Sequence, residues 1–365
     1  MLTIKIPALL VLLAFGQFAF AHPPGLSSAE LSLGDRESGI NLTFAMQDIE
    51  AFVSMDNDLD AEVTPAELTA AKSSIATLVA SEMQITVDES HVISTVNGDV
   101  GFDDQNNVHV RFLLTMPVAN KIRYQSKLLN KMAAGHKQYL TVKNQQGRIL
   151  IEKMLTQQDN TFLLDLSSIK ANKEQGPIHS NTFTEFVQLG IEHILTGYDH
   201  LLFLLSLLVV THRFWPALKI ITFFTLAHSI TLALASFNVI NFPGSIVEPL
   251  IAVTIVYVAL ENIWRGEQVK GREWLTFFFG LIHGFGFASV LREMNIGDNE
   301  GGILLPLFSF NLGVELGQIS VAALVLPIIW WLHRRPLVDQ WLAPACSILT
   351  GIAGTYWLVD RTLLS

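Results

Sequence analysis

The sequence predicts two parts of different fold class: an exported β-rich, sandwich-like domain with a helical insertion, followed by an all-α bundle of six transmembrane helices. Hydrophobic residues make up 50% of the 365 residues and charged residues only 15%. This composition is too apolar for an ordinary soluble domain and too polar for a chain that lies wholly in a membrane. Short alternating stretches fill residues 22–178, whereas long apolar runs begin near Phe183. The domains are therefore expected at 22–178 and 183–361.

The first 21 residues have the pattern of a secretory signal peptide. They contain a basic residue, Lys5, then an apolar run that ends in the small-x-small sequence Ala19-Phe20-Ala21. Such a segment is removed after export, so the domain that follows is expected outside the cytoplasm.

Charge and cysteine content exclude several classes of partner and site. The formal net charge is −10, and the chain lacks the excess of basic residues that binding to nucleic acid requires. The single cysteine, Cys346, excludes a disulfide within the chain and a thiolate metal cluster.

The exported domain is predicted to be a small β-sandwich. Apolar and polar residues alternate in several short stretches separated by turn-forming residues, which is the pattern of half-buried strands. The predicted strands are 30–33, 39–47, 83–87, 108–115, 139–143 and 148–152.

An acidic loop, DNDLDAEVTPAE at 56–67, interrupts the strands and precedes a predicted helix at 65–80. Its spacing resembles the calcium loop of an EF-hand, so the insertion is predicted to be EF-hand-like and to bind calcium. Ala61 replaces the glycine of the sharp turn, which should weaken binding. The alternative is an acidic loop that caps the helix through Thr64 and Pro65. The acidic residues of the loop are Asp56, Asp58, Asp60, Glu62 and Glu67.

Six apolar segments predict six membrane spans. With the soluble domain outside, the inner links hold seven Lys and Arg residues, and the outer links and tail hold two, Arg292 and Arg361. This bias obeys the positive-inside rule and predicts an inner (plasma) membrane protein whose N-terminal domain and C-terminus are periplasmic. The predicted spans are 187–210, 217–238, 247–264, 274–292, 303–332 and 341–359.

Ionisable and polar residues lie inside these apolar spans, where they are costly and indicate function. In the first span, His193 and His200 are two helical turns apart, so a straight helix would separate them by about 10 Å along its axis. Gly280, Gly284 and Gly286 flank His283 and should let another helix approach closely. Imidazoles and carboxylates at one depth predict a site for a divalent transition metal such as nickel, cobalt or zinc. The predicted ligands are His193, Asp199, His200, His228, His283 and Glu315, with Glu248, Asn311 and Gln318 as secondary groups.

Five motifs together resemble the HupE/UreJ family. They are G-x-x-H-x-x-x-G-x-D-H-L-L-F-L-L at 190–205, AHSITL at 227–232, VEPLIA at 247–252, HGFGFA at 283–288 and FNLGVELGQ at 310–318. The resemblance covers residues 180–360 and implies a membrane protein associated with hydrogenase and urease systems and regarded as a nickel or cobalt permease. The chain is similar to the branch that has a long exported N-terminal domain with an EF-hand-like acidic loop.

Three functions remain open at this point. The first is a transition-metal permease that binds its metal ion midway through the bilayer. The second is an intramembrane zinc-dependent hydrolase acting on a lipid or membrane peptide, with Glu315 or Asp199 as base and Ser229 or Asn311 as an oxyanion or substrate contact. The third is a metal or calcium sensor or assembly partner, whose exported domain would bind an exported or membrane protein.

Overall fold

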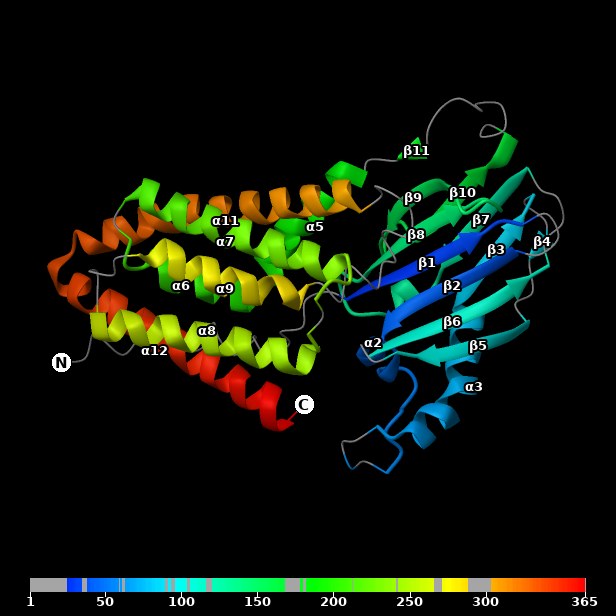
Figure 1. Ribbon diagram of the computed structural model, residues 1–365, viewed down its shortest axis with the longest axis horizontal. Helices are drawn as coiled ribbons and strands as arrows, with labels where there is room; N and C mark the ends of the chain where they lie inside the picture. Colours follow the sequence, from blue (N-terminus) through cyan, green and yellow to red (C-terminus); the bar gives the residue numbers. More distant parts are fainter. Residues whose placement is uncertain are drawn as a thin grey trace.

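A computed structural model describes two adjoining parts of the chain, a β-rich N-terminal part and a helical C-terminal part (Figure 1). The predicted signal peptide lies outside the described residues, as do Ala61 and Glu62 of the acidic loop. The structure describes residues 25–34, 38–58, 60, 63–88, 91–92, 96–103, 106–115, 120–167, 178–179, 182–211, 213–240, 242–265, 271–287 and 303–364.

The larger sheet of the N-terminal part has seven strands in the order β11-β9-β8-β1-β2-β6-β5. The pairs β1/β8 and β11/β9 are parallel and the others are antiparallel. The strands are β1 (Leu26–Ser32), β2 (Ser38–Ala45), β5 (Val96–Phe102), β6 (Asn107–Leu114), β8 (Lys137–Lys143), β9 (Ile149–Leu155) and β11 (Ile178–His179).

The smaller sheet has four strands in the order β10-β7-β3-β4, all paired antiparallel. They are β3 (Met83–Val87), β4 (His91–Val92), β7 (Lys121–Ser126) and β10 (Thr161–Asp165). Each of the six strands predicted from the alternation overlaps one of the strands β1, β2, β3, β6, β8 and β9. The prediction of a β-rich N-terminal part is confirmed.

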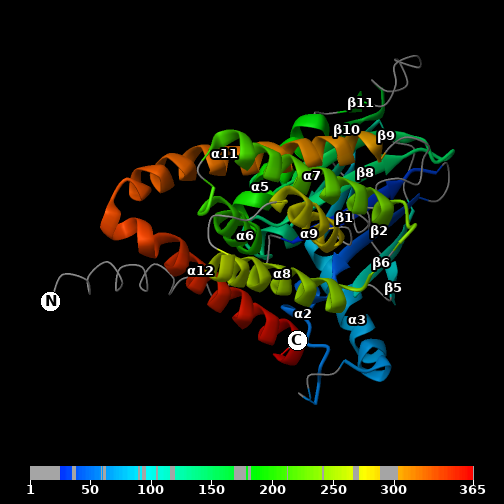
Figure 2. The ribbon, with the colours of Figure 1, turned by 60° about the vertical axis from the view of Figure 1, so that its left-hand side comes forward.

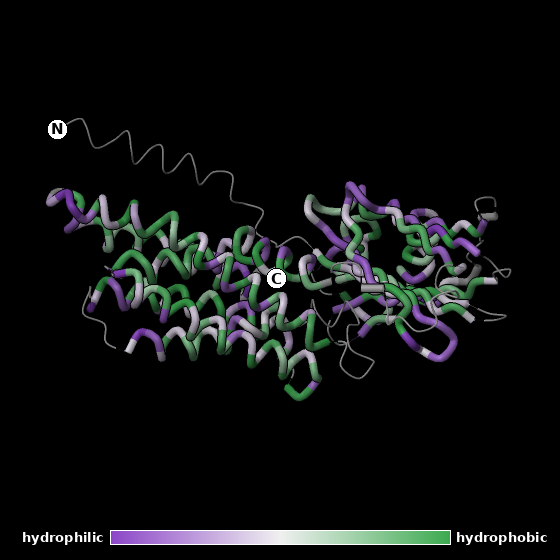
Figure 3. The backbone as a smooth tube through the Cα atoms, turned by 90° about the horizontal axis from the view of Figure 1, so that it is seen from above, coloured by the Kyte–Doolittle hydropathy of each residue, from purple (hydrophilic) through white to green (hydrophobic). Residues whose placement is uncertain are grey.

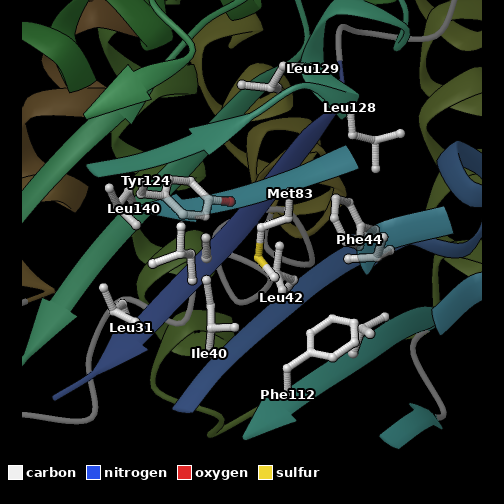
Figure 4. Close-up of a cluster of buried hydrophobic side chains, with 14 of the residues drawn as sticks. Leu31, Ile40, Leu42, Phe44, Met83, Phe112, Tyr124, Leu128, Leu129 and Leu140 are labelled. Carbon is white, nitrogen blue, oxygen red and sulfur yellow. The ribbon is translucent and has the colours of Figure 1, made fainter. Parts of the chain in front are cut away.

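One hydrophobic core lies between the two sheets (Figure 4). Leu42 and Phe112 contribute to it from the larger sheet, and Met83 from the smaller one. Tyr124 on β7 also joins the sheets, because its hydroxyl donates to Gln138 Oε1 on β8 over 2.8 Å. Two helices, α2 (Met46–Glu50) and α3 (Pro65–Glu82), and a short 3-10 turn, η1 (Leu128–Asn130), add to this core.

Helix α3 begins where the sequence predicts, at Pro65, and extends two residues past the predicted end to Glu82. A capping box fixes its start: Thr64 Oγ1 accepts from the Glu67 amide, and the Glu67 carboxylate accepts from the Thr64 amide. Pro65 stands in the first turn, where a missing N–H costs nothing. The capping function proposed for Thr64 is confirmed.

The helical part consists of helices that run roughly side by side (Figures 1 and 2). Four described helices are long and apolar enough to cross a membrane, or five spans if the bent pair α5 and α6 counts as one. Helix α9 has 15 described residues, and its predicted span continues outside the described part, so the sixth span stays a prediction. The helices are α5 (Thr182–Thr196), α6 (Tyr198–Leu208), α7 (Phe214–Ser236), α8 (Gly244–Arg265), α9 (Arg272–Gly286), α11 (Leu304–His333) and α12 (Pro336–Val359), followed by the π-helical η2 (Asp360–Leu364).

The prediction of one straight helix at 187–210 is wrong. Residues in this range form two helices, α5 and α6, which meet at Gly197 and are bent by 71°. A break at membrane depth requires that the freed backbone groups lie in protein or beside a polar cavity. Here the Gly197 amide still donates to His193 O, and its carbonyl accepts from the Leu201 amide. The backbone therefore turns sharply without leaving these groups unpaired.

Glycines allow two pairs of helices to pack closely. A Cβ on Gly280 or Gly284 of α9 would meet backbone atoms of Phe224 or His228 on α7 at 2.5 Å. Gly190 and Gly313 face each other's helices in the same way, so α5 and α11 are also in backbone contact. The predicted close approach of a helix to the glycines beside His283 is confirmed for Gly280 and Gly284.

Exposed tryptophans gather at the end of the helices that lies away from the sheets. The hydropathy colouring shows mainly apolar helices with hydrophilic residues at this end (Figure 3). Tryptophan next to Arg is typical of the boundary between bilayer and water. The exposed tryptophans are Trp215, Trp264, Trp274, Trp331 and Trp341.

Candidate metal centre

The break at Gly197 brings two histidines together. The rings of His193 on α5 and His200 on α6 have centroids 4.6 Å apart, not about 10 Å apart as in a straight helix. Gly197 makes this possible because a Cβ there would lie 2.7 Å from His193 O and 2.9 Å from His200 Nδ1. The glycine and the bend therefore create the contact between the two rings.

Three histidines from α5, α6 and α7 converge, and this group is called the histidine cluster below. His193, His200 and His228 each offer a ring nitrogen within 4.8 Å of the others. Ligand nitrogens about 2.0–2.1 Å from one tetrahedral ion lie roughly 3.3 Å apart. Small side-chain movements would bring these three nitrogens to that spacing, so the cluster fits a divalent transition metal.

Asp199 orients the ring of His200. Asp199 Oδ1 lies 3.2 Å from His200 Nδ1 and also accepts from the His200 amide at 3.0 Å. Since a carboxylate only accepts hydrogen bonds, the proton of the neutral ring belongs on Nδ1. Nε2 is then left with its lone pair, as in metal sites where a carboxylate holds a ligating histidine.

Asn311 orients His228 by the same logic. Its amide group Nδ2 donates to Leu307 O over 2.8 Å, which directs the amide oxygen toward His228 Nδ1 at 3.2 Å. The Nδ1 proton of His228 is donated to that oxygen, and Nε2 retains the lone pair. Asn311, predicted as a secondary group, thus contacts a histidine of the cluster.

His283 lies beside the cluster but is not one of the three converging residues. Its ring centroid is 5.2 Å from that of His200. Its Nε2 lies 2.9 Å from Thr254 Oγ1, which donates its own proton to Ile251 O over 2.7 Å. The Thr254 hydroxyl must therefore accept from His283 Nε2, so the lone pair is on Nδ1.

The four histidines contain ring nitrogens that are buried and have no hydrogen-bond partner among the described residues. A buried polar atom without a partner is costly, so such a group calls for an explanation. Five such nitrogens on four neighbouring side chains, three of them with the lone pair fixed by a hydrogen bond on the other ring nitrogen, fit ligands of a cation. These atoms are His193 Nδ1 and Nε2, His200 Nε2, His228 Nε2 and His283 Nδ1.

A cation from the end of the chain also contacts this centre. Arg361 in η2 places Nη2 3.6 Å from Asp199 Oδ2 and Nε 3.8 Å from Glu248 Oε2. Glu248, predicted to lie at the outer end of its helix, is half exposed and pairs with this arginine. The sequence indicated Arg361 only as a charge in the outer tail that bears on membrane topology. Its place after the last span and the acidic residues at the outer ends of other spans were the available clue.

Three predicted residues contact other partners. Glu315 Oε1 accepts from Thr222 Oγ1 at 2.8 Å, and its carboxylate is not in the three-histidine group. Gln318 Oε1 accepts from Thr225 Oγ1 at 3.1 Å. The Ser229 hydroxyl donates to the Thr225 carbonyl of its own helix. All three therefore contact or belong to α7 rather than the converging ring nitrogens.

Phenylalanine rings enclose the histidines from both directions along the helices. Phe287 and Phe310 are stacked 4.3 Å apart, and Phe287 lies 4.6 Å from the His193 ring. Phe203 and Phe224 lie 5.0 and 5.2 Å from the His283 ring. These rings form an apolar lining around the histidines, beside their polar partners Asp199, Asn311 and Thr254.

The acidic loop of the N-terminal part is partly described. Asp56, Asp58 and Asp60 bring carboxylate oxygens within 4.8 Å of one another. Glu67, the last acidic residue of the loop, accepts backbone N–H bonds from Thr64 and Asn57, and these bonds lower the pKa of its carboxyl to about 2. The capping geometry is therefore formed, while the EF-hand and its calcium stay predictions.

These features define a class of protein: a membrane protein with several apolar helices that buries histidines from four of them beside an N-terminal β-rich domain. Residues 169–361 match the family described as HupE / UreJ protein. The match covers more than half of the chain, and the protein belongs to this family. A search of curated proteins found no relative that matches. Membership implies a role related to the transport of metals such as nickel or cobalt across a membrane.

Proposed function

We propose that this protein is a permease for a divalent transition metal of the nickel or cobalt type, and that His193, His200 and His228 bind the ion. One observation carries the proposal: ring nitrogens from three helices lie within 4.8 Å of one another, and Asp199 and Asn311 hold two of the rings with Nε2 unprotonated. Neutral imidazole is a preferred ligand of nickel, cobalt and zinc. His283 is a fourth ligand or the next one along the path.

The arrangement around the cluster supports a path along the helices. His193 lines a small cavity between the helical part and the β-rich domain. In the other direction, Phe203, Phe224 and Phe279 form a layer of contacting rings. Binding sites at broken helices are usual in transporters, where relative movement of the two halves opens the opposite side. Movement about the Gly197 break is the change we propose for release of the ion.

A buried polar network lies beyond the phenylalanine layer, nearer the end of the helices that carries the exposed tryptophans. Arg272 at the start of α9 is within 3.5 Å of Glu261 on α8, and both side chains are 6% exposed. Arg272 also contacts Asn262, whose amide donates to Ser206 O. This buried network ties α6, α8 and α9 together below the phenylalanine layer and would have to open for the ion to leave.

We propose that the end with the exposed tryptophans faces the cytoplasm and that the β-rich domain and the C-terminus are periplasmic. Arg213, Arg265 and Arg272 lie at the tryptophan end, whereas Arg361 lies at the other. Both distributions agree with the positive-inside rule and with an aromatic belt. The inner membrane is the bilayer that this topology requires.

The hydrolase alternative has no specific observation in its favour. Its proposed base Glu315 and its proposed substrate contact Ser229 both have hydrogen bonds directed away from the cluster. Asp199, the other proposed base, holds His200 and pairs with Arg361. These contacts support the permease over a water-activating site.

The test is uptake of radioactive nickel or cobalt into proteoliposomes that contain the full-length protein. We expect flux above that of protein-free liposomes, and loss of that flux in His200→Ala and His228→Ala. His109→Ala is the matched control, because His109 is a half-exposed histidine of the β-rich domain. Equal flux in wild type and both cluster variants would reject the proposed site, and absence of flux in the wild type would reject the permease.

A further inference from the structure

A small cavity joins the β-rich domain to the histidine cluster. Its volume is about 20 Å³, enough for a water molecule. Leu26 and Lys137 line it from the β-rich domain, and Glu192, His193 and Thr196 line it from α5. The cavity therefore reaches a histidine of the cluster, and a residue of the β-rich domain stands at its wall.

An ion pair between the two domains crosses this cavity. Lys137 Nζ contacts Glu192 Oε2, with the lysine side chain 13% exposed and the glutamate 34% exposed. Glu192 Oε1 accepts from Gln188 Nε2 over 2.7 Å. The carboxylate is thus held in place on α5, immediately before His193 in sequence, and its other oxygen is occupied by a cation from the β-rich domain.

A carboxylate at this position is suited to receive a divalent cation. Its negative charge attracts a divalent cation, which a neutral imidazole cannot do, and the neighbouring His193 offers ring nitrogens without a partner among the described residues. An ammonium group on the same carboxylate opposes this, because it neutralises the charge and repels an approaching cation at short range. The metal ion and Lys137 therefore compete for Glu192.

We propose that Glu192 is the first ligand that the incoming metal ion meets, and that Lys137 is a tethered cation which occupies this ligand and limits the rate of metal binding. The inference rests on the proposed function, since it concerns access to the same histidine cluster. It gives the β-rich domain a defined role: that domain supplies the competing charge at the outer opening of the site.

The domain interface does not depend on this ion pair alone. Tyr139 and Phe186 pack edge to face with ring centroids 5.7 Å apart. The Met154 amide donates to Glu185 Oε2 at 3.3 Å. Removal of the Lys137 charge should therefore change access to the cluster while the two domains stay together.

The experiment measures the rate of cobalt binding to the full-length protein in detergent by stopped-flow absorbance. We expect Lys137→Met to raise the association rate at least fivefold and Glu192→Gln to lower it at least fivefold. Lys143→Met is the matched control, because Lys143 lies on the same strand and forms a similarly buried pair with Glu30 away from the cavity. Its rate should stay within twofold of wild type.

The opposite effects expected for the two variants distinguish the proposal from a purely structural role of the ion pair. If the pair only held the domains together, Lys137→Met and Glu192→Gln would change the rate in the same direction, and that result would overturn the inference. Unchanged rates in both variants would overturn it as well. If the wild type binds cobalt and His200→Ala does not, the proposed metal site survives such a failure; if the wild type binds none, both proposals fall.

Discussion

Asp199→Asn is the substitution that isolates the orientation of His200 from the ligand itself. The amide has nearly the volume of the carboxylate, and His200 keeps its ring. Asp199 Oδ1 is 3.2 Å from His200 Nδ1, and Arg361 lies 3.6 Å from Oδ2. The change removes the negative charge that fixes the proton on Nδ1 and leaves the Arg361 guanidinium without one of its two carboxylate partners.

The expected loss can be worked from these contacts. A hydrogen bond to a charged acceptor contributes about 1.5–3 kcal/mol and one between neutral groups about 0.5–1.5 kcal/mol, so the substitution removes roughly 1–1.5 kcal/mol from the hold on His200. Arg361 also loses the negative charge of Asp199, so its positive charge repels a bound cation more strongly. Loss of a group that orients a metal ligand typically lowers affinity 10- to 100-fold, or about 1.4–2.7 kcal/mol. We expect a loss in this range.

The assay is calorimetric titration of the detergent-purified protein with nickel or cobalt. Asp339→Asn is the matched control, because Asp339 Oδ1 also pairs with a histidine, His333 Nδ1, at 2.5 Å but in another part of the chain. It should bind metal as the wild type does. Wild-type affinity in Asp199→Asn, or an equal loss in Asp339→Asn, would refute the role given to Asp199.

Three further predictions concern the helix break, the β-rich domain and the acidic loop. Gly197→Ala should lower metal affinity at least tenfold in the same titration, because its Cβ would collide with His200 Nδ1; unchanged affinity would contradict the need for glycine. Burial lowers the pKa of His136 from 6.5 to about 4, so the unfolded chain takes up a proton that the folded domain excludes. Stability should therefore fall by up to about 3 kcal/mol as pH drops from about 6.5 to 4, and thermal unfolding of His136→Gln should lack this part of the pH dependence. Calcium calorimetry should give binding that Asp58→Asn weakens at least tenfold; no calcium heat in the wild type would reject the EF-hand prediction.

The sequence predicted the strands best where burial on one face leaves a regular alternation. In β2 the apolar residues Ile40, Leu42 and Phe44 recur every second residue, so this strand was located. Strand β7, KIRYQS, was missed because only Ile122 and Tyr124 are large apolar residues among its six. Whether such a segment forms a strand depends on the strands that pair with it, and these lie far away in the sequence.

The histidines of the centre were predicted from their cost in an apolar span, but their geometry was not. A glycine lowers helix stability by about 1 kcal/mol and does not by itself specify a 71° bend. The partner of His283, Thr254, resembles any other threonine of an apolar helix. Glu315 is four residues beyond Asn311 on α11, about 6 Å farther along the axis, which brings it to Thr222 instead of the cluster.

X-ray absorption of the nickel-loaded protein tests the central claim most directly, because it reports the atoms bound to the metal. We expect a first shell with imidazole nitrogens from His193, His200 and His228, one nickel per chain, and loss of one imidazole contribution in His228→Ala. A shell of oxygen atoms alone, identical in wild type and His228→Ala, would contradict the claim that the converging histidines are the metal site.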